Sequence, residues 1–217
     1  MASAAVIDRR TRCGAVVTRG ILVTVHDLYG GRLPLLPLEF YFKLRRHHDV
    51  QPFRFRPRTQ TLETSGKDDD GAINFVTHGY GALVLREAFR YVDWNYTKSK
   101  VVMLAPPNRG IRYYAAMKKH VGIAGYGGVA AEELATLTDE SLDLRLGKLP
   151  RRCYPLVLSG SLSLNPFNQA NYPNDGTVTV EETTLPGEFR HQVLPVSHYL
   201  LPAHPTAIYL ARSFLEA

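Results

Sequence analysis

The 217-residue sequence contains only two cysteines, Cys13 and Cys153, and no apolar run long enough to cross a membrane. Two cysteines cannot form the disulfide framework of a small secreted domain, and neither has the spacing of a metal site. A membrane-spanning helix needs about 18 consecutive apolar residues. The start, MASAAVIDRR, has no continuous apolar core like that of a secretory signal. We therefore expect a soluble, intracellular protein with reduced cysteines, no metal and no cofactor.

The sequence also lacks internal repeats and low-complexity segments, which excludes repeat architectures. Apolar residues make up 45% of the chain and charged residues 21%, the composition of a globular protein with a full core. We expect one domain over residues 1–217, with a basic N-terminal extension at 1–20. The Ala, Ser and Arg content of the start slightly favours a mitochondrial over a cytoplasmic location, although Asp8 counts against a targeting segment.

Acidic residues are scarce in the first quarter of the chain. Residues 1–58 carry eleven Lys or Arg and four Asp or Glu, a net charge of +7, whereas the remaining residues have a net charge of −1. Such asymmetry is typical of a contact face for nucleic acid, anionic lipid or an acidic protein, and also of a merely solvated surface. The candidate contacts for an anionic partner are Arg45, Arg46, Arg54, Arg56 and Arg58.

Strand and helix patterns alternate along the chain. Runs rich in apolar and β-branched residues predict strands at 21–25, 53–56, 72–78, 100–107, 154–161, 177–183 and 191–198. Helical spacing of apolar residues predicts three helices and permits a fourth, at 35–48, 81–92, 205–217 and 130–137. This alternation predicts an α/β fold, in which a mainly parallel sheet carries helices on both faces.

The segment FRFR at 53–56 alternates aromatic and basic residues. Strict alternation predicts a half-exposed strand near a sheet edge, with Phe53 and Phe55 on one side and the arginines on the other. The same interleaving occurs in proteins that bind single-stranded nucleic acid, but the strand interpretation is favoured. RNA therefore stays one candidate partner of the basic N-terminal quarter.

Polar residues follow three of the predicted strands, at the sheet edge where ligands of open α/β proteins bind. Gly79 lies in a turn that opens a predicted helix, Asp175 lies in the loop YPNDGTV, and His198 follows a strand in LPVSHYL. An Asp before Gly is often only a turn former, and a His after a strand can be purely structural. The order of elbow, acid and histidine is nevertheless that of hydrolases with a Ser, Asp and His triad.

Six segments resemble, in the correct order, the lipase/esterase branch of the α/β-hydrolase superfamily, near bacterial lipase-like and GPI inositol-deacylase-like proteins. They are VTVHDLYGG, NFVTHGYGALVLR, KVVMLAPPNRG, SGSLSLNPFN, PNDGTVTVEETTLPG and VLPVSH. The resemblance runs from about residue 21 to the end and implies an α/β-hydrolase fold. It further implies that Asp175 is the catalytic acid and His198 the catalytic histidine, and that the backbone N–H groups of Leu28 and Tyr80 form the oxyanion hole.

The chain departs from this family in three ways. Gly79 stands where the family has its nucleophilic serine, and Asp27 replaces the glycine that follows the histidine of the oxyanion loop. Between Thr59 and Gly71, about a dozen polar residues take the place of a whole helix, so we expect a fold shortened in the middle. Glycine adopts the strained elbow easily. Loss of the serine costs roughly 10⁶ in kcat.

No other residue is placed to replace the serine. Tyr80 is one position too late, Ser197 points away from its neighbour His198, and Cys153 begins a strand at its wrong end. We therefore expect a catalytically inactive hydrolase that acts as a structural or binding subunit of a larger assembly with protein partners. The alternatives are a serine ester hydrolase, seen as a Ser→Gly variant or using water activated by His198, and a receptor for a small molecule.

Overall fold

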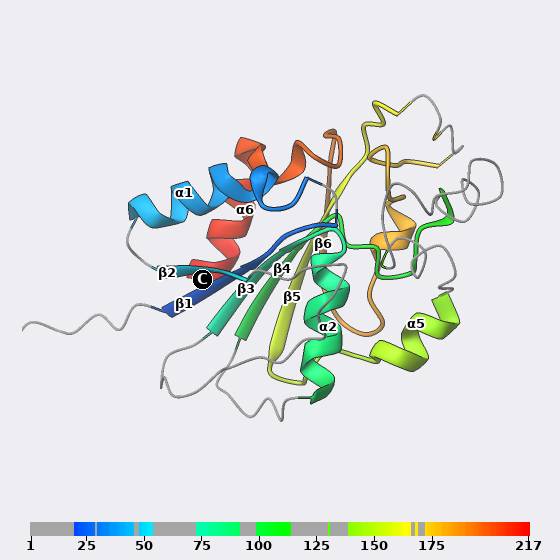
Figure 1. Ribbon diagram of the computed structural model, residues 1–217, viewed down its shortest axis with the longest axis horizontal. Coiled ribbons are helices and arrows are strands. Elements are labelled where there is room, and N and C mark those ends of the chain that lie inside the picture. The colour runs from blue at the N-terminus through cyan, green and yellow to red at the C-terminus, as the bar shows by residue number, and fades with distance from the viewer. Residues whose placement is uncertain are drawn as a thin grey trace, which may run out of the picture.

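The computed structural model describes residues 20–28, 30–45, 48–53, 73–91, 99–113, 130, 139–165, 168 and 172–217. Within these residues, six strands form one sheet in the order β2-β1-β3-β4-β5-β6, and every neighbouring pair is parallel (Figure 1). The strands are β1 (Gly20–Val25), β2 (His48–Phe53), β3 (Ile73–His78), β4 (Ser99–Leu104), β5 (Cys153–Gly160) and β6 (Arg190–Leu194). The parallel α/β architecture predicted from the sequence is confirmed.

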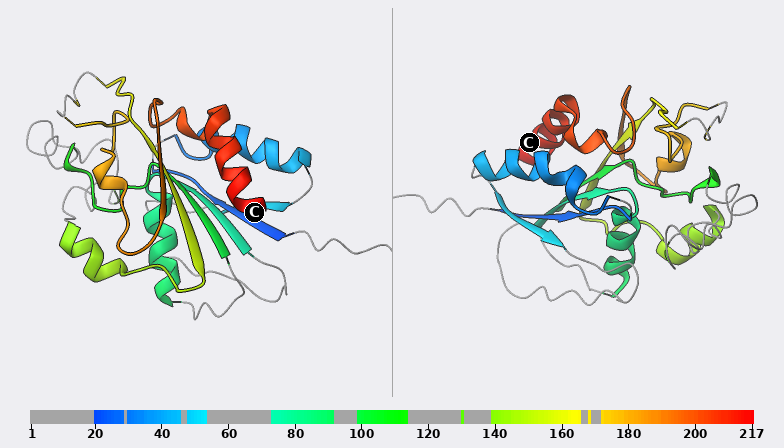
Figure 2. Two further views of the ribbon diagram at one scale, coloured as in Figure 1. Left: turned by 180° about the vertical axis from the view of Figure 1, so that it is seen from behind. Right: turned by 45° about the horizontal axis from the view of Figure 1, so that its top comes forward.

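Helices cover both faces of the sheet (Figures 1 and 2). On one face lie α1 (Leu36–Arg45), which follows the short helix η1 (Leu33–Leu35), and the C-terminal α6 (Pro205–Glu216). On the other face lie α2 (Gly81–Tyr91) and α5 (Asp139–Leu146). Two more short helices, η3 (Glu181–Thr183) and η4 (Leu201–Ala203), follow β5 and β6 in the chain. Among the described residues, no helix is long and apolar enough to span a bilayer.

The core consists of two layers, one on each face of the sheet. Side chains alternate along a strand, so Val76 and Val102 pack under α1 and α6, whereas Phe75 and Val101 pack under α2. Because both faces are covered, β3 and β4 are apolar at successive positions, which is why their sequences show no alternation. The sheet thus presents the carboxyl ends of its strands along one edge, where the predicted site residues lie.

Two boundaries near the sheet edge differ from those predicted. The helix predicted to run to His48 ends at Arg45, and His48 already pairs with Gly20 as the first residue of β2. The strand predicted at 53–56 overlaps β2 only at Phe53, while residues 54–56 lie outside the described residues. Basic residues are favourable in the last turn of a helix, which is why the sequence predicts the helix to continue through the basic cluster at 45–48. The predicted edge position is correct for β2 among the described strands.

The strand predicted at 177–183 is absent from the structure. Thr179 makes one isolated bridge to Asn174, and η3 begins directly afterwards. Side-chain hydrogen bonds explain the difference: the Thr179 N–H donates to the Glu182 carboxylate at 2.7 Å, and the Glu182 N–H donates to the Thr179 hydroxyl at 3.2 Å. This reciprocal capping fixes a helical turn where the alternation of Thr and Val favoured a strand.

Several predictions fall on other parts of the chain. The N-terminal extension, the polar segment between Thr59 and Gly71 and, apart from Ala130, the candidate helix at 130–137 lie outside the described residues. Helix α5 was not predicted, because its sequence DESLDLRL has no clear apolar face.

Candidate functional site

The turn between β3 and α2 places Gly79 at the carboxyl edge of the sheet. Gly79 has φ of +51°, a left-handed conformation that is unfavourable for residues with a side chain. Its N–H donates to the carbonyl of Leu104 in β4 at 2.9 Å, and its carbonyl accepts the N–H of Ala82 in α2 at 3.1 Å. The strand–turn–helix geometry of a nucleophile elbow is therefore present, although the residue at its centre has no nucleophile.

Asp175 and His198 lie together at the same edge, as their order in the sequence suggested. The Asp175 Oδ2 atom lies 2.8 Å from His198 Nδ1, and the His198 N–H donates to the Asp175 carbonyl at 2.9 Å. Asp175 Oδ1 accepts the N–H groups of Thr177 and Val178 at 2.9 and 2.7 Å. Both side chains are buried, each with 2% of its surface exposed. This pairing is the one that orients the imidazole in a catalytic triad.

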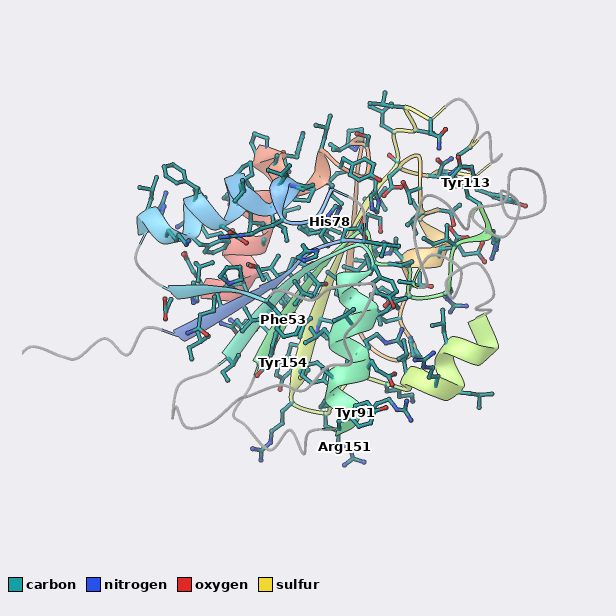
Figure 3. The ribbon with its side chains drawn as sticks, viewed as in Figure 1. Phe53, His78, Tyr91, Tyr113, Arg151 and Tyr154 are labelled. Atoms are coloured by element: carbon teal, nitrogen blue, oxygen red, sulfur yellow. The ribbon has the colours of Figure 1, made fainter. Side chains whose placement is uncertain are left out.

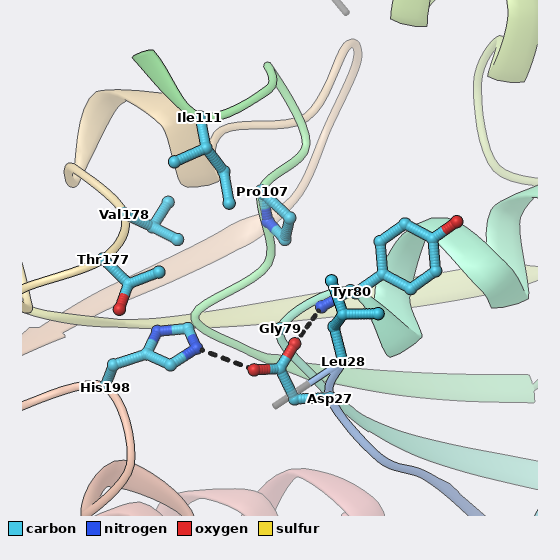
Figure 4. Close-up of a pocket in the computed structure, with 9 residues that line it drawn as sticks. All are labelled: Asp27, Leu28, Gly79, Tyr80, Pro107, Ile111, Thr177, Val178 and His198. Atoms are coloured by element: carbon cyan, nitrogen blue, oxygen red, sulfur yellow. Dashed lines mark hydrogen bonds and ion pairs between the residues drawn. The ribbon is translucent and has the colours of Figure 1, made fainter. Parts of the chain in front are cut away.

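Asp27, which the sequence showed only as a departure from the glycine of the oxyanion loop, has its side chain at the centre of the site. Its Oδ1 atom accepts the Tyr80 N–H at 2.7 Å, and its Oδ2 atom lies 3.3 Å from His198 Nε2 (Figure 4). A Cβ atom at position 79 would lie 2.1 Å from Asp27 Oδ1 and 2.4 Å from Asp27 Cγ, far inside van der Waals contact. The Asp27 carboxylate thus fills the space that a side chain at position 79 would need. It also accepts the hydrogen bond of the Tyr80 N–H, the group predicted to be a donor of the oxyanion hole.

His198 lies between the carboxylates of Asp27 and Asp175. Burial alone would lower the pKa of His198, but the charges and hydrogen bonds of the two carboxylates outweigh it and raise this pKa to about 10. Burial alone would raise the pKa of Asp27, yet the hydrogen bond and charge of His198 lower it to about 2. At neutral pH the imidazole is therefore protonated, and both of its nitrogens donate to carboxylates. In this state it has no lone pair with which to act as a general base.

His78, the last residue of β3, is labelled in Figure 3 and packs against His198. It is fully buried, its ring centroid lies 4.8 Å from that of His198, and its Nε2–H donates to the His198 carbonyl at 3.1 Å. Burial, together with the charge on His198, lowers the pKa of His78 to about 4. His78 is therefore neutral at physiological pH and holds the backbone of His198 without adding charge to the site.

A small pocket opens beside the Asp27–His198 pair. It is lined by Asp27, Leu28, Gly79, Tyr80, Pro107, Ile111, Thr177, Val178 and His198. Figure 4 shows the apolar side chains of Pro107, Ile111 and Val178 on the side facing the pair. Leu28, the second residue predicted for the oxyanion hole, is part of this lining. The pocket contains about 220 Å³ of space, part of it open to solvent.

The other candidate residues lie away from this pocket. Cys153 begins β5 at the opposite end of the sheet, near the labelled Tyr154 in Figure 3, and burial raises the pKa of its thiol to about 12. Arg45 is exposed at the end of α1, with its guanidinium 5.3 Å from the centre of the Tyr41 ring. The remaining predicted contacts for an anionic partner lie outside the described residues: Arg46, Arg54, Arg56 and Arg58.

Over the part of the chain that the structure describes, no three His, Cys, Asp or Glu side chains are grouped so that they could hold a metal ion. The carboxylates of Asp27 and Asp175 instead share the protonated imidazole between them.

The chain matches no protein-family model and no curated protein, but it matches solved structures. The mature lipase BlEst2 of Bacillus licheniformis is 15% identical, with a TM-score of 0.61 over 91% of this chain and 92% of the lipase. Phospholipase PlaB from Legionella pneumophila is 16% identical, with a TM-score of 0.64 over 89% of this chain and 59% of the phospholipase. An enol-lactonase from Burkholderia xenovorans LB400 is 13% identical, with a TM-score of 0.51 over 91% of this chain and 92% of that enzyme. The chain therefore has the α/β-hydrolase fold, as its sequence motifs predicted.

Proposed function

We propose that this protein is a catalytically inactive member of the α/β-hydrolase fold that serves as a binding or structural subunit. The observation that carries the proposal is the position of the Asp27 carboxylate. A serine hydrolase needs a nucleophile at the elbow, a neutral histidine beside it and free N–H donors for the oxyanion. Here Gly79 has no nucleophile, His198 is held protonated, and the Tyr80 N–H already donates to Asp27.

The fit between Gly79 and Asp27 argues against a single artificial Ser→Gly change. With Asp27 in place, the Cβ atom of a serine at position 79 would lie 2.1 Å from a carboxylate oxygen. The lipase-like pattern has glycine at position 27, which leaves this space open. Two departures that match each other support a lineage in which the serine chemistry was given up and the elbow was repacked around a carboxylate.

The hydrolytic alternative would require Asp27 to leave the site. Water activation by His198 needs a neutral Nε2 that faces water. Instead, Nε2 lies 3.3 Å from the Asp27 carboxylate, and His198 is only 2% exposed. Deprotonation of His198 would also leave two buried carboxylates without a cation between them, which is costly.

The activity test is hydrolysis of p-nitrophenyl acetate and butyrate by the unaltered chain and four variants: Gly79→Ser, Asp27→Gly, the two combined, and His198→Ala. We expect the unaltered chain to match His198→Ala, which serves as the background. Gly79→Ser alone should stay at background because Asp27 blocks the new hydroxyl. The double variant should exceed background, since it has a serine, a Tyr80 N–H that no longer donates to Asp27, and a histidine beside one carboxylate instead of two.

Two results would refute the proposal. Turnover by the unaltered chain that disappears in His198→Ala would mean that the site is catalytic as it stands. The subunit role has its own test, sedimentation of the native chain from its own cells without cross-linking. Migration as a free 24.3 kDa chain would contradict that role, whereas stable migration with a much larger particle is expected.

A further inference from the structure

Helix α1 is apolar on two opposite sides. Its inner side packs into the core under the sheet, next to α6. Its outer side, together with η1, carries four exposed apolar residues that we name the α1 stripe: Leu33 (72% exposed), Leu36 (42%), Phe40 (64%) and Leu44 (66%). Leu36, Phe40 and Leu44 follow one another at intervals of four residues, so they form one row along the helix. A contiguous apolar row of this kind on a protein surface marks a contact site.

The stripe cannot be buried by a rotation of α1. Leu38 and Phe42 are fully buried on the inner side, and Glu39 is buried beside them with 2% of its surface exposed. The Glu39 carboxylate accepts hydrogen bonds from the Thr24 hydroxyl at 2.7 Å and from Arg32 Nε at 2.8 Å. Any turn of the helix would break these bonds and expose the core residues. The outward direction of the stripe is therefore fixed by the fold.

The charged side chains that α1 exposes beside the stripe are basic. Lys43 lies three residues after Phe40, and Arg45 follows Leu44 at the end of the helix. Neither forms a salt bridge with any of the described carboxylates. The one acid of the helix, Glu39, is buried and paired with Arg32. The outer side of α1 thus combines apolar residues with two basic side chains that form no salt bridge to a described carboxylate, within the quarter of the chain whose net charge is +7.

We propose that the α1 stripe docks the protein on a membrane surface that contains anionic lipids. A helix that lies parallel to such a surface inserts Leu and Phe into the boundary between headgroups and acyl chains, while Lys and Arg meet the lipid phosphates. Figures 1 and 2 show α1 at the outside of the molecule, where a flat surface can approach it. Docking does not depend on whether the Asp27–His198 site is catalytic, so it stands apart from the proposed function.

A lipid surface fits the stripe better than the other occupants do. A second copy of the chain would place Lys43 and Arg45 of both copies around one contact, with no acid on the outer side of either α1 to neutralise them. A protein partner is less favoured because three of the four stripe residues are leucines, which are under-represented among the residues that dominate protein–protein affinity. Leu and Phe flanked by Lys and Arg are instead the composition of helices that lie at membrane interfaces.

The test is co-sedimentation of the full chain with vesicles of phosphatidylcholine and phosphatidylserine in a ratio of about seven to three, beside vesicles of phosphatidylcholine alone. The stripe variant is Phe40→Ser/Leu44→Ser, and the charge variant is Lys43→Gln/Arg45→Gln. Leu144→Ser is the matched control, because Leu144 is 88% exposed on α5, on the opposite face of the sheet. Circular dichroism and a thermal melt verify that each variant is folded.

We expect the unaltered chain and Leu144→Ser to bind the phosphatidylserine vesicles equally, and more weakly at high salt. The charge variant should bind roughly 30-fold more weakly, and the stripe variant at least about tenfold more weakly. Absence of binding by the unaltered chain would overturn the proposal. So would equal binding by the stripe variant, because the contact would then be electrostatic only. A change in oligomeric size in the stripe variant without vesicle binding would assign the stripe to a second copy instead.

Discussion

At the scale of single residues, the Asp27 carboxylate occupies the space that a side chain at position 79 would fill. We expect Gly79→Ala to lower the free energy of unfolding by more than the 1–3 kcal/mol or so that a strained left-handed residue costs, because Cβ would also collide with Asp27. In an Asp27→Gly background the collision is gone and only the strain remains. Urea unfolding of the four proteins in this double-mutant cycle should give a coupling energy of about 1–3 kcal/mol.

Gly147 provides the matched control for this cycle. It has φ of +59°, close to that of Gly79, but a Cβ at position 147 would have no atom within 4 Å. Gly147→Ala should therefore show the backbone strain alone, and Asp27→Gly should leave its effect unchanged. Equal losses for Gly79→Ala and Gly147→Ala would mean that the Asp27 carboxylate moves aside without cost.

The sequence could reveal part of this site but not its centre. Asp175 and His198 follow strands in the order of a triad, so a local pattern was enough to pair them. The contact between Asp27 and the Tyr80 N–H joins residues 53 positions apart and depends on how closely the loop after β1 approaches the start of α2. The only local sign was an acid where the lipase-like pattern has glycine, and that sign did not say where the carboxylate points.

At the scale of elements, that close approach of β1 and α2 can be tested at Gly81. A Cβ at position 81 would lie 2.6 Å from the carbonyl oxygens of Val25 and His26. In an exposed helix, Gly→Ala usually stabilises by about 1 kcal/mol. Here we expect the opposite sign, a loss of about 1–3 kcal/mol, because backbone atoms would have to shift. A urea titration measures the change in the free energy of unfolding. A gain in stability would show that the loop carrying Asp27 moves away from position 81 at little cost in free energy.

The elements that were predicted correctly are those whose buried residues follow a regular pattern along the sequence. β3 and β4 are covered on both faces, so their apolar runs were unambiguous, and α6 shows a regular apolar side. The segment at 177–183 was misassigned because side-chain hydrogen bonds between Thr179 and Glu182 decide its structure. Helix α1 was predicted from the apolar residues that face the core. Its second apolar side could be recognised only in the structure, from the exposed fractions of Leu36 and Phe40.

At the scale of the whole molecule, two buried histidines link stability to pH with opposite signs. His198 has its pKa raised from 6.5 to about 10, so its stabilising contribution is complete below pH 6.5 and is lost as the pH rises toward 10. His78 has its pKa lowered from 6.5 to about 4, so stability is lost as the pH falls from 6.5 toward 4. We therefore expect the free energy of unfolding to be greatest near pH 6.5, with each histidine contributing a slope of up to about 1.4 kcal/mol per pH unit.

Variants can separate the two limbs of this profile. His78→Asn should flatten the acid limb between pH 6.5 and 4 and leave the alkaline limb in place. The pair Asp27→Asn/His198→Gln removes the buried charge and should flatten the alkaline limb between pH 6.5 and 10. Below pH 3.8, protonation of Asp27, whose pKa is lowered to about 2, should add a further loss that only the second variant lacks. Urea unfolding at intervals of pH measures the slopes of these limbs in the unaltered chain and in each variant. If the alkaline limb persists in Asp27→Asn/His198→Gln, then His198 is not held protonated between two carboxylates, and the strongest physical argument for an inactive site is lost.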